Sequence, residues 1–175
     1  LLRSMTGKKK GTTFNYVDQL GYDKFEQRVY LKYGNGTKTH YEYEPERRRL
    51  HNMTAQTKAK RLFMDNVYTY DKVNNIKMLE NKAPIPSSNL MGGSSTYSYD
   101  YDDLYRLTTA EGSYKGSNEE HSYTLSMDYN SVGGITQKTQ VHKKGDQEQK
   151  KTTYDLAYAY GETQPNAPIH IGDQI

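Results

Sequence analysis

The chain has 175 residues, among them 18 Tyr but no Cys and no Trp, and its 24 basic and 21 acidic residues give a formal charge of only +3. This balance does not indicate a nucleic-acid groove, the lack of Cys excludes disulfides and thiolate metal sites, and no apolar stretch is long enough for a membrane span or a signal-peptide core. The aromatic content of 12% is not that of a disordered chain, because disordered chains are poor in aromatic residues.

Two hairpins are predicted in the first quarter of the chain. Residues 7–13, GKKKGTT, have the wrong spacing for a phosphate loop, because Lys10 precedes the second Gly, and we expect a hairpin tip there. Residues 29–44, VYLKYGNGTKTHYEYE, contain Asn35-Gly36, a pair that suits the positive backbone angles of a tight hairpin turn. We therefore expect two antiparallel strands joined at Asn35 and Gly36.

The next segment, residues 44–64, is the only candidate for a helix. Its central part, residues 49–60, lacks the apolar stripe that an amphipathic helix needs. We therefore predict strands and loops in this segment, and no helix elsewhere.

Further along, residues alternate in the manner of half-buried strands. In HSYTLSMDY, residues 121–129, the side chains of one face are His, Tyr, Leu, Met and Tyr, whereas those of the other are Ser, Thr, Ser and Asp. Residues 152–160 and the tyrosines of residues 97–101 repeat this alternation. Tyrosines two residues apart stack along one face of a strand, so we expect a tyrosine-covered inner face on a single sheet without a thick apolar core.

A motif recurs along the chain: Tyr, Asp or Asn, any residue, Val or Leu, two residues, then Ile or Leu. A period of 20–50 residues marks an array of supersecondary units, here β-hairpins with turn formers after the leading Tyr. One further interval after the last motif leads to Tyr160. The motifs are YDKFEQRV (22–29), YEPERRRL (43–50), YDKVNNI (70–76), YDDLYRL (101–107) and YNSVGGI (129–135).

The motif residues are expected to act in the structure and not in catalysis. The predicted repeat-motif residues are Tyr43, Tyr68, Tyr70, Asp71, Ile76, Tyr97, Tyr99, Tyr101, Asp102, Arg106, Leu107, Tyr129 and Ile135. The predicted turn residues are Asn35, Gly36, Asn75, Gly133 and Gly134.

In the order of these motifs, from about residue 3 to residue 172, the sequence resembles the Rhs/YD-repeat family, which includes bacterial polymorphic toxins, shell components of insecticidal toxin complexes, and teneurins. It departs from the family pattern at Asn74 and Tyr105, which stand where Gly is usual, at Asn130, which replaces Asp, and at Gly134, which replaces Asn. These departures put individual turn geometries in question.

The resemblance implies an all-β fold in which successive antiparallel hairpins form a curved, spiral sheet segment of a hollow shell. Residues 1–175 would then be one repeat region of about five to six hairpins, a fragment of a longer shell that encloses a toxin or effector domain. The implied location is outside a bacterium, secreted or on the cell surface. The Asp-Pro segment at which such shells cut themselves is absent from this sequence.

No catalytic, cofactor or metal site is predicted. The five His residues never lie two or four positions apart, so a metal site would need a long-range constellation. The acids of residues 100–103 lack the Gly and Glu of a calcium loop. The expected partners are neighbouring repeats and an enclosed toxin domain, without nucleic acid or membrane insertion. The alternative is a module that binds a cell-surface partner or a glycan through exposed tyrosines.

Overall fold

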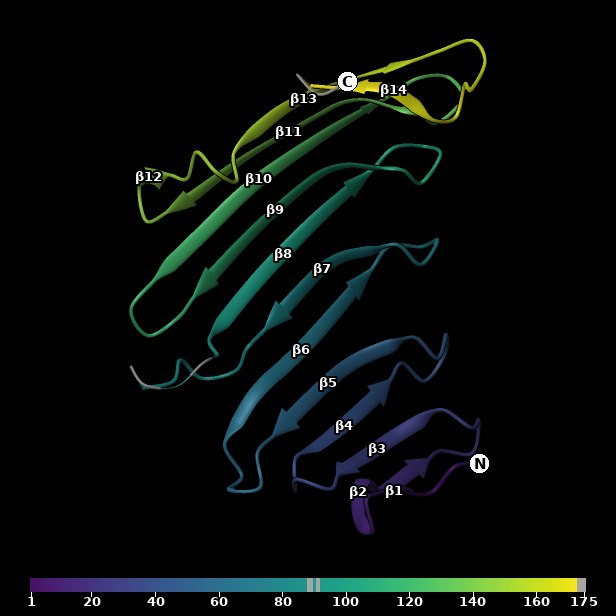
Figure 1. The fold of residues 1–175 in the computed structure, drawn as a ribbon, viewed down its shortest axis with the longest axis vertical. Helices are drawn as coiled ribbons and strands as arrows, with labels where there is room; N and C mark the ends of the chain where they lie inside the picture. The colour runs from purple at the N-terminus through teal and green to yellow at the C-terminus, as the bar shows by residue number, and fades with distance from the viewer. Residues whose placement is uncertain (88–89, 91, 173–175) are drawn as a thin grey trace. The chain divides into compact units, whose positions relative to one another are not determined.

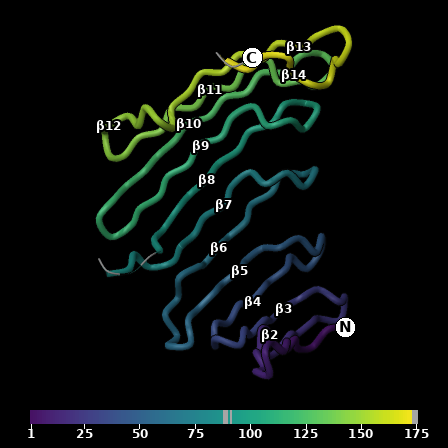
Figure 2. The backbone as a smooth tube through the Cα atoms, viewed as in Figure 1, coloured from purple at the N-terminus to yellow at the C-terminus, as the bar shows by residue number. Residues whose placement is uncertain are grey.

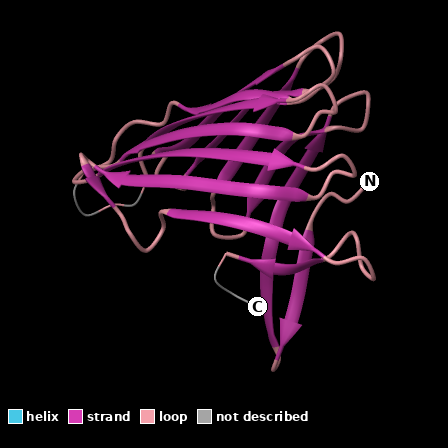
Figure 3. Cartoon of the chain, turned by 90° about the horizontal axis from the view of Figure 1, so that it is seen from above, coloured by secondary structure: helices cyan, strands magenta, loops and turns pink. Residues whose placement is uncertain are grey.

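The structure is a computed structural model that describes residues 1–87, 90 and 92–172. In these residues all regular structure is β-strand (Figure 3), and the predicted all-β fold is confirmed. Hydrogen bonds pair β1 to β6 antiparallel in chain order, and likewise β9, β10, β11, β13 and β14, while β12 pairs with β11. No helix of the described residues has the length and apolar character that crossing a membrane requires.

The strands follow the chain in short antiparallel pairs. Their bounds are β1 Met5–Lys9, β2 Thr12–Tyr22, β3 Arg28–Tyr33, β4 Lys38–Tyr43, β5 Leu50–Gln56, β6 Leu62–Tyr70, β7 Ile76–Asn81, β8 Ser94–Tyr101, β9 Leu107–Lys115, β10 Glu120–Tyr129, β11 Ile135–Lys144, β12 Gln147–Glu148, β13 Tyr154–Tyr160 and β14 Pro168–Ile171.

The contacts divide the chain into two units. The first comprises Leu1–Thr69 and Leu79–Ser94, and the second comprises Tyr70–Met78 and Ser95–Ile175. Within the first unit β1 to β5 lie side by side, and within the second β9, β10 and β11 do so (Figure 1). Because successive strands are antiparallel, every second turn within a unit lies at the same edge, which is seen in the tube view (Figure 2).

The two early hairpins form where the sequence predicts them, but the second has a different turn. Lys10 and Gly11 have positive φ and join β1 to β2. Between β3 and β4 the N–H of Tyr33 donates to the Thr37 carbonyl at 2.9 Å, and of the Asn35-Gly36 pair only Gly36 has positive φ. The expected positive backbone angle is therefore present at Gly36 and absent at Asn35, whose side chain accepts the Thr37 N–H at 2.9 Å in a loop of residues 34–37.

The segment 44–64 contains a turn, β5, a second loop and the start of β6. The predicted strands and loops are thus confirmed. The segment lacks the apolar stripe that would stabilise a helix. Two of the predicted repeat-motif residues, Ile76 and Ile135, are the first residues of β7 and β11.

The fold has little buried core. Among the described residues only Leu31, Ala55, Ala83 and Ala110 are buried apolar residues, and no large side chain is fully enclosed. A single sheet without a covering layer has this property, as the composition predicts. Backbone hydrogen bonds and half-buried aromatic rings therefore provide much of the stabilisation.

Candidate functional surface: repeat turns and the tyrosine face

In four of the five motifs, those with Asp23, Asp71, Asp102 and Asn130, the residue after the leading Tyr closes the turn: one of its side-chain oxygens accepts two backbone N–H groups, from the residues two and four positions later. In the second unit the acceptors and donors are Asp71 with Val73 and Asn75 at 2.9 and 2.8 Å, Asp102 with Leu104 and Arg106 at 2.9 and 2.9 Å, and Asn130 with Val132 and Gly134 at 3.1 and 2.8 Å. Asn130 thus accepts the same two hydrogen bonds as the Asp that it replaces, because either side chain offers an accepting oxygen.

These bonds lower the pKa of the turn carboxyls. Burial pushes the pKa of Asp71 up, but the N–H and side-chain amide of Asn75 outweigh it and hold the pKa below its ordinary value. For Asp102 the N–H of Arg106 is the main cause of the lowered pKa, burial opposes it, and the Arg106 side chain adds to it. Both turns are therefore built around ionised carboxylates.

The lowered pKa values predict a loss of stability in acid. A carboxyl whose pKa is depressed on folding stabilises the fold above its unfolded pKa of about 3.9, and this stabilisation is lost as the pH falls through the folded value. We expect the urea midpoint to be insensitive to these groups between about pH 5 and 8, and to fall below that range. Asp71→Asn should retain the turn at neutral pH, as Asn130 does, and reduce the acid loss. Equal acid losses in both proteins would contradict this account.

One turn position takes a left-handed conformation whatever its side chain. Asn74 has φ 79° and Tyr105 has φ 63°, and Gly133 at the same motif position has φ 88°. The two departures from Gly therefore leave the turn conformation intact. The two side chains strain the backbone, because a Cβ is unfavourable in the left-handed region of φ and ψ. The strain is smaller for Asn74 than for Tyr105, since Asn adopts this conformation more readily than other residues with a Cβ.

Replacing Tyr105 by Gly is expected to raise the free energy of unfolding by about 1 kcal/mol, because the strain of a Cβ at positive φ is relieved. Asn74→Gly should have a smaller effect, since Asn tolerates this conformation. Urea denaturation of both variants beside the unchanged chain measures the difference. An equal or larger gain for Asn74→Gly would count against backbone strain as the cause.

The leading tyrosines connect successive hairpins. In four cases the hydroxyl donates to the backbone carbonyl of the first strand residue after the preceding turn. In the first unit Tyr43 donates to Arg28 at 2.9 Å. In the second unit Tyr101 donates to Ile76 at 2.9 Å, Tyr129 to Leu107 at 2.7 Å, and Tyr160 to Ile135 at 2.9 Å. The interval between motifs places these residues in neighbouring hairpins, so one bond type is repeated from hairpin to hairpin.

Tyr129→Phe is expected to lower the free energy of unfolding by about 0.5–1.5 kcal/mol, because a part-buried hydrogen bond is lost while the ring remains. Tyr105→Phe is the matched control, since the Tyr105 ring is exposed. Urea denaturation of the two variants measures the contrast. Equal stabilities would show that the tyrosine hydroxyl does not couple the hairpins.

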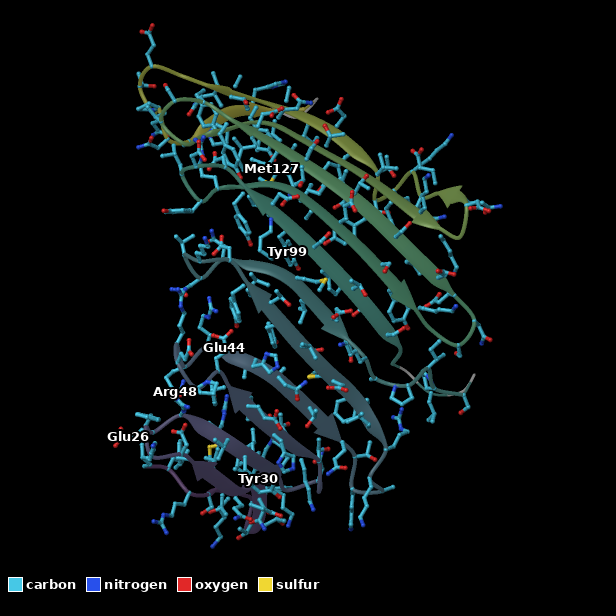
Figure 4. The ribbon with its side chains drawn as sticks, turned by 180° about the vertical axis from the view of Figure 1, so that it is seen from behind. Glu26, Tyr30, Glu44, Arg48, Tyr99 and Met127 are labelled. Carbon is cyan, nitrogen blue, oxygen red and sulfur yellow. The ribbon has the colours of Figure 1, made fainter. Side chains whose placement is uncertain are left out.

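Arginines add a second connection between turns. Arg106 donates from Nε to Asp102 at 2.6 Å and from Nη1 to the Asn130 carbonyl of the next turn at 3.2 Å. Its guanidinium lies 4.6 Å from the ring centroid of Tyr129. In the first unit Arg48, labelled in Figure 4, pairs with Asp23 of the preceding turn. The sequence motif contains Arg106 but does not reveal that it spans two hairpins.

The predicted tyrosine face is present on the second unit. In β10 the residues alternate strictly between half-buried and exposed, with the Tyr, Leu and Met residues on the half-buried side. Tyr99 and Met127 of this unit are labelled in Figure 4. The rings of Tyr97 and Tyr123 lie 6.4 Å apart. Both rings lie over Gly112 of the intervening strand β9, which has no side chain to oppose them.

The remaining predicted tyrosines are also half-buried. Tyr68 and Tyr70 end β6, and Tyr99 and Tyr101 end β8. Burial raises the pKa of Tyr99 and of Tyr101 above the ordinary value. The rings therefore cover the sheet while remaining partly in contact with solvent, as expected of a face without a second layer.

The opposite face of the second unit is polar. Lys77 pairs with Asp100, and the Thr109 hydroxyl donates to the same carboxylate at 3.2 Å. A shallow hollow of about 320 Å³ lies on strands β8 to β10. The side chains facing it include Thr96, Ser98, Glu111, Ser113, Ser122 and Thr124.

The structure also brings together two histidines that the sequence separates. His121 Nδ1 lies 2.9 Å from His142 Nε2 on the neighbouring strand, and Glu119 Oε2 is 3.4 Å from His121 Nε2. The sequence spacing of the two histidines does not predict this pair, because their contact depends on the register between β10 and β11. The described residues contain no group of three or more His, Cys, Asp or Glu that could hold a metal ion.

Known proteins share both sequence and fold with this chain, although no family model matches it. It is 34% identical over 104 residues to the toxin subunit YenC1 of Yersinia entomophaga, which covers 55% of the chain. A structure of a Photorhabdus luminescens Tc holotoxin pore matches 95% of the chain with a TM-score of 0.78 and 22% identity. The resemblance to the Rhs/YD-repeat proteins is confirmed.

The chain corresponds to a small part of these Rhs/YD-repeat relatives. It covers 10% of YenC1 and 8% of the matched holotoxin chain. The crystal structure of TcdB2-TccC3 without the hypervariable C-terminal region matches 91% of the chain, 8% of its own length, with a TM-score of 0.73 and 22% identity. Because this match persists without that region, the repeats correspond to a part of the relative outside it.

Proposed function

We propose that the chain is a stretch of wall in a larger Rhs/YD-repeat toxin-complex protein, and that it helps to enclose a toxin domain without catalysing a reaction. Its residues would form five to six hairpin units of a longer repeat region. The motif tyrosines, acids and turn residues act in holding the hairpins together. The proposed place of action is outside the bacterium that makes the protein.

The hydroxyl connection from a leading Tyr to the preceding hairpin, repeated along the second unit, carries this proposal. A bond repeated from Tyr101 to Tyr129 to Tyr160 extends a sheet one hairpin at a time, which suits a wall of many similar units. The single-layer sheet supports it further, because one layer separates two spaces without filling either. The likeness to Tc toxin structures over nearly the whole chain agrees with this role.

Electron microscopy of the complete gene product that carries the chain tests the proposal. We expect a closed, hollow particle in which these residues form part of the wall, and a segment inside the particle that resists added protease. Gly112→Val should make this segment accessible to protease, because the β-branched side chain would displace the rings over Gly112, whereas Gly161→Ala should not. A solid two-layer domain, or an enclosed segment that is cut equally in all variants, would refute the wall.

A glycan array probed with the same protein addresses the alternative function. The wall proposal expects signals at background level. Binding that is lost when the exposed ring of Tyr16 or Tyr33 is removed would favour recognition of a cell-surface glycan instead.

A further inference from the structure

An apolar stripe runs along the turn edge of the second unit. The fourth residue of three successive repeat turns is aliphatic and exposed: Val73 at 46%, Leu104 at 67% and Val132 at 70%. A single exposed aliphatic residue needs no explanation. The same motif position exposed in three consecutive turns does, because the neighbouring strand β10 of this unit turns its apolar residues to the half-buried face.

The turns themselves do not require aliphatic side chains at this position. There the backbone N–H donates to the Asp or Asn two residues earlier, at 2.9 Å for Val73 and Leu104 and at 3.1 Å for Val132. Any residue except Pro supplies that N–H, and polar residues are the usual choice for exposed turns. The residues just before are polar in each case, Lys, Asp and Ser. The aliphatic side chains therefore serve a contact outside the turn.

The spacing of the stripe indicates what kind of surface would fit it. Successive turns at one edge are two strands apart, which is about 9.5 Å. A facing surface that meets all three side chains must repeat at the same distance. A second row of β-hairpins has this repeat, because its turns are also two strands apart.

The size of the stripe indicates that its partner is tethered. Three aliphatic side chains bury far less than the roughly 1,200 Å² of a stable complex between free proteins. A contact this small persists only at the high effective concentration that covalent connection provides. The structural relatives contain much more chain, since these residues cover 8% of the matched holotoxin chain.

We propose that Val73, Leu104 and Val132 pack against the loop edge of another row of hairpins in the same polypeptide, and so join adjacent rows of the wall. This inference rests on the proposed wall function. The stripe acts as a seam: hydrogen bonds extend each row along the sheet, and the aliphatic side chains hold one row to the next.

The corresponding position in the first unit has a different surface. Phe25 lies there, and the cations of Lys24 and Arg48 are 5.0 and 4.3 Å from its ring centroid. The next turn is one residue longer and carries Arg47 near its tip. The seam is thus assigned to the second unit only.

Cysteine labelling of the complete gene product in a cysteine-free background tests the seam. Single Cys residues replace Leu104 and Val132, and Ser131→Cys is the matched control on the same exposed turn. For each variant, the alkylation rate of the Cys in the native protein is divided by its alkylation rate in urea. In particles that electron microscopy shows to be closed, we expect Leu104→Cys and Val132→Cys to react at least tenfold more slowly than Ser131→Cys.

The outcomes separate the seam from the wall. Closed particles with equal rates at all three positions overturn the seam and leave the wall intact, whereas the absence of closed particles removes the wall and the seam with it. Protection that rises with protein concentration identifies a second copy, and protection that requires lipid vesicles identifies a membrane; either overturns the proposal. As a check that does not depend on thiols, the double variant Leu104→Ser and Val132→Ser should open the particles at a lower temperature than Ser131→Ala.

Discussion

Replacing Gly112 by Ala is expected to lower the free energy of unfolding by about 1–3 kcal/mol, the usual cost of overpacking a well-packed site. A Cβ at this position would lie 2.2 Å from the Tyr123 ring and 2.8 Å from the Tyr97 ring. The two rings come from the flanking strands β8 and β10 and pack over the glycine backbone, so the added Cβ must displace both. Urea denaturation with circular dichroism measures the change.

Gly161→Ala is the matched control in the same unit. There the added Cβ would meet only the side chain of Ile169, at 3.2 Å, which can rotate. We expect a change within about 1 kcal/mol, in either direction, because the alanine also restricts the unfolded chain. If both variants lose the same stability, the ring packing over Gly112 is not what makes that position sensitive.

The turns were the most predictable part of this molecule. Local chain geometry determines which residue types a repeat turn needs. The turn acids Asp71 and Asp102 and the aliphatic residue Ile135 at the seventh motif position could therefore be recognised from the sequence. The Asn35-Gly36 turn was placed correctly, but the positive angle expected at Asn35 is absent, because Asn-Gly also fits longer loops in which only the Gly has positive φ.

The contacts between hairpins could not be predicted in the same way. Gly112 looks like an ordinary strand glycine until the register sets Tyr123 opposite it, and His121 meets His142 only because β10 and β11 are paired. The hydroxyl acceptor of Tyr129 is a backbone carbonyl that has no sequence signature. Register depends on pairing along whole strands, which a single sequence does not display.

Two kinds of contact therefore stabilise this fold, one within turns and one between them. Local side-chain bonds, such as those of Asp102, shape each turn independently of its neighbours. Tyr129 and Arg106 then act between turns, so that damage to one hairpin is passed to the next. A sheet of this kind should lose structure along the row of hairpins and not as isolated hairpins.

The chain is expected to unfold in alkali in one transition in which tyrosinate appears. Burial is the main cause that raises the pKa of Tyr99, Tyr101, Tyr123 and Tyr129 above the ordinary value. A group whose acidic form is favoured on folding stabilises the fold fully below its unfolded pKa of about 10 and loses that contribution as the pH rises through the folded pKa. Near-ultraviolet absorbance of tyrosinate and circular dichroism, followed together above pH 9, should change at the same midpoint.

Tyr99→Phe and Tyr123→Phe separate the tyrosines from the lysines, which also lose charge in this range. A Phe ring retains the packing but cannot ionise, so each substitution should move the alkaline midpoint to higher pH, and the double variant should move it further. Stability near pH 7 should change little, because the rings and not the hydroxyls cover the sheet at these two positions. Tyrosinate that forms gradually while the circular dichroism stays constant would show that the rings ionise without leaving the sheet, and the tyrosine face would then not be what holds the sheet together.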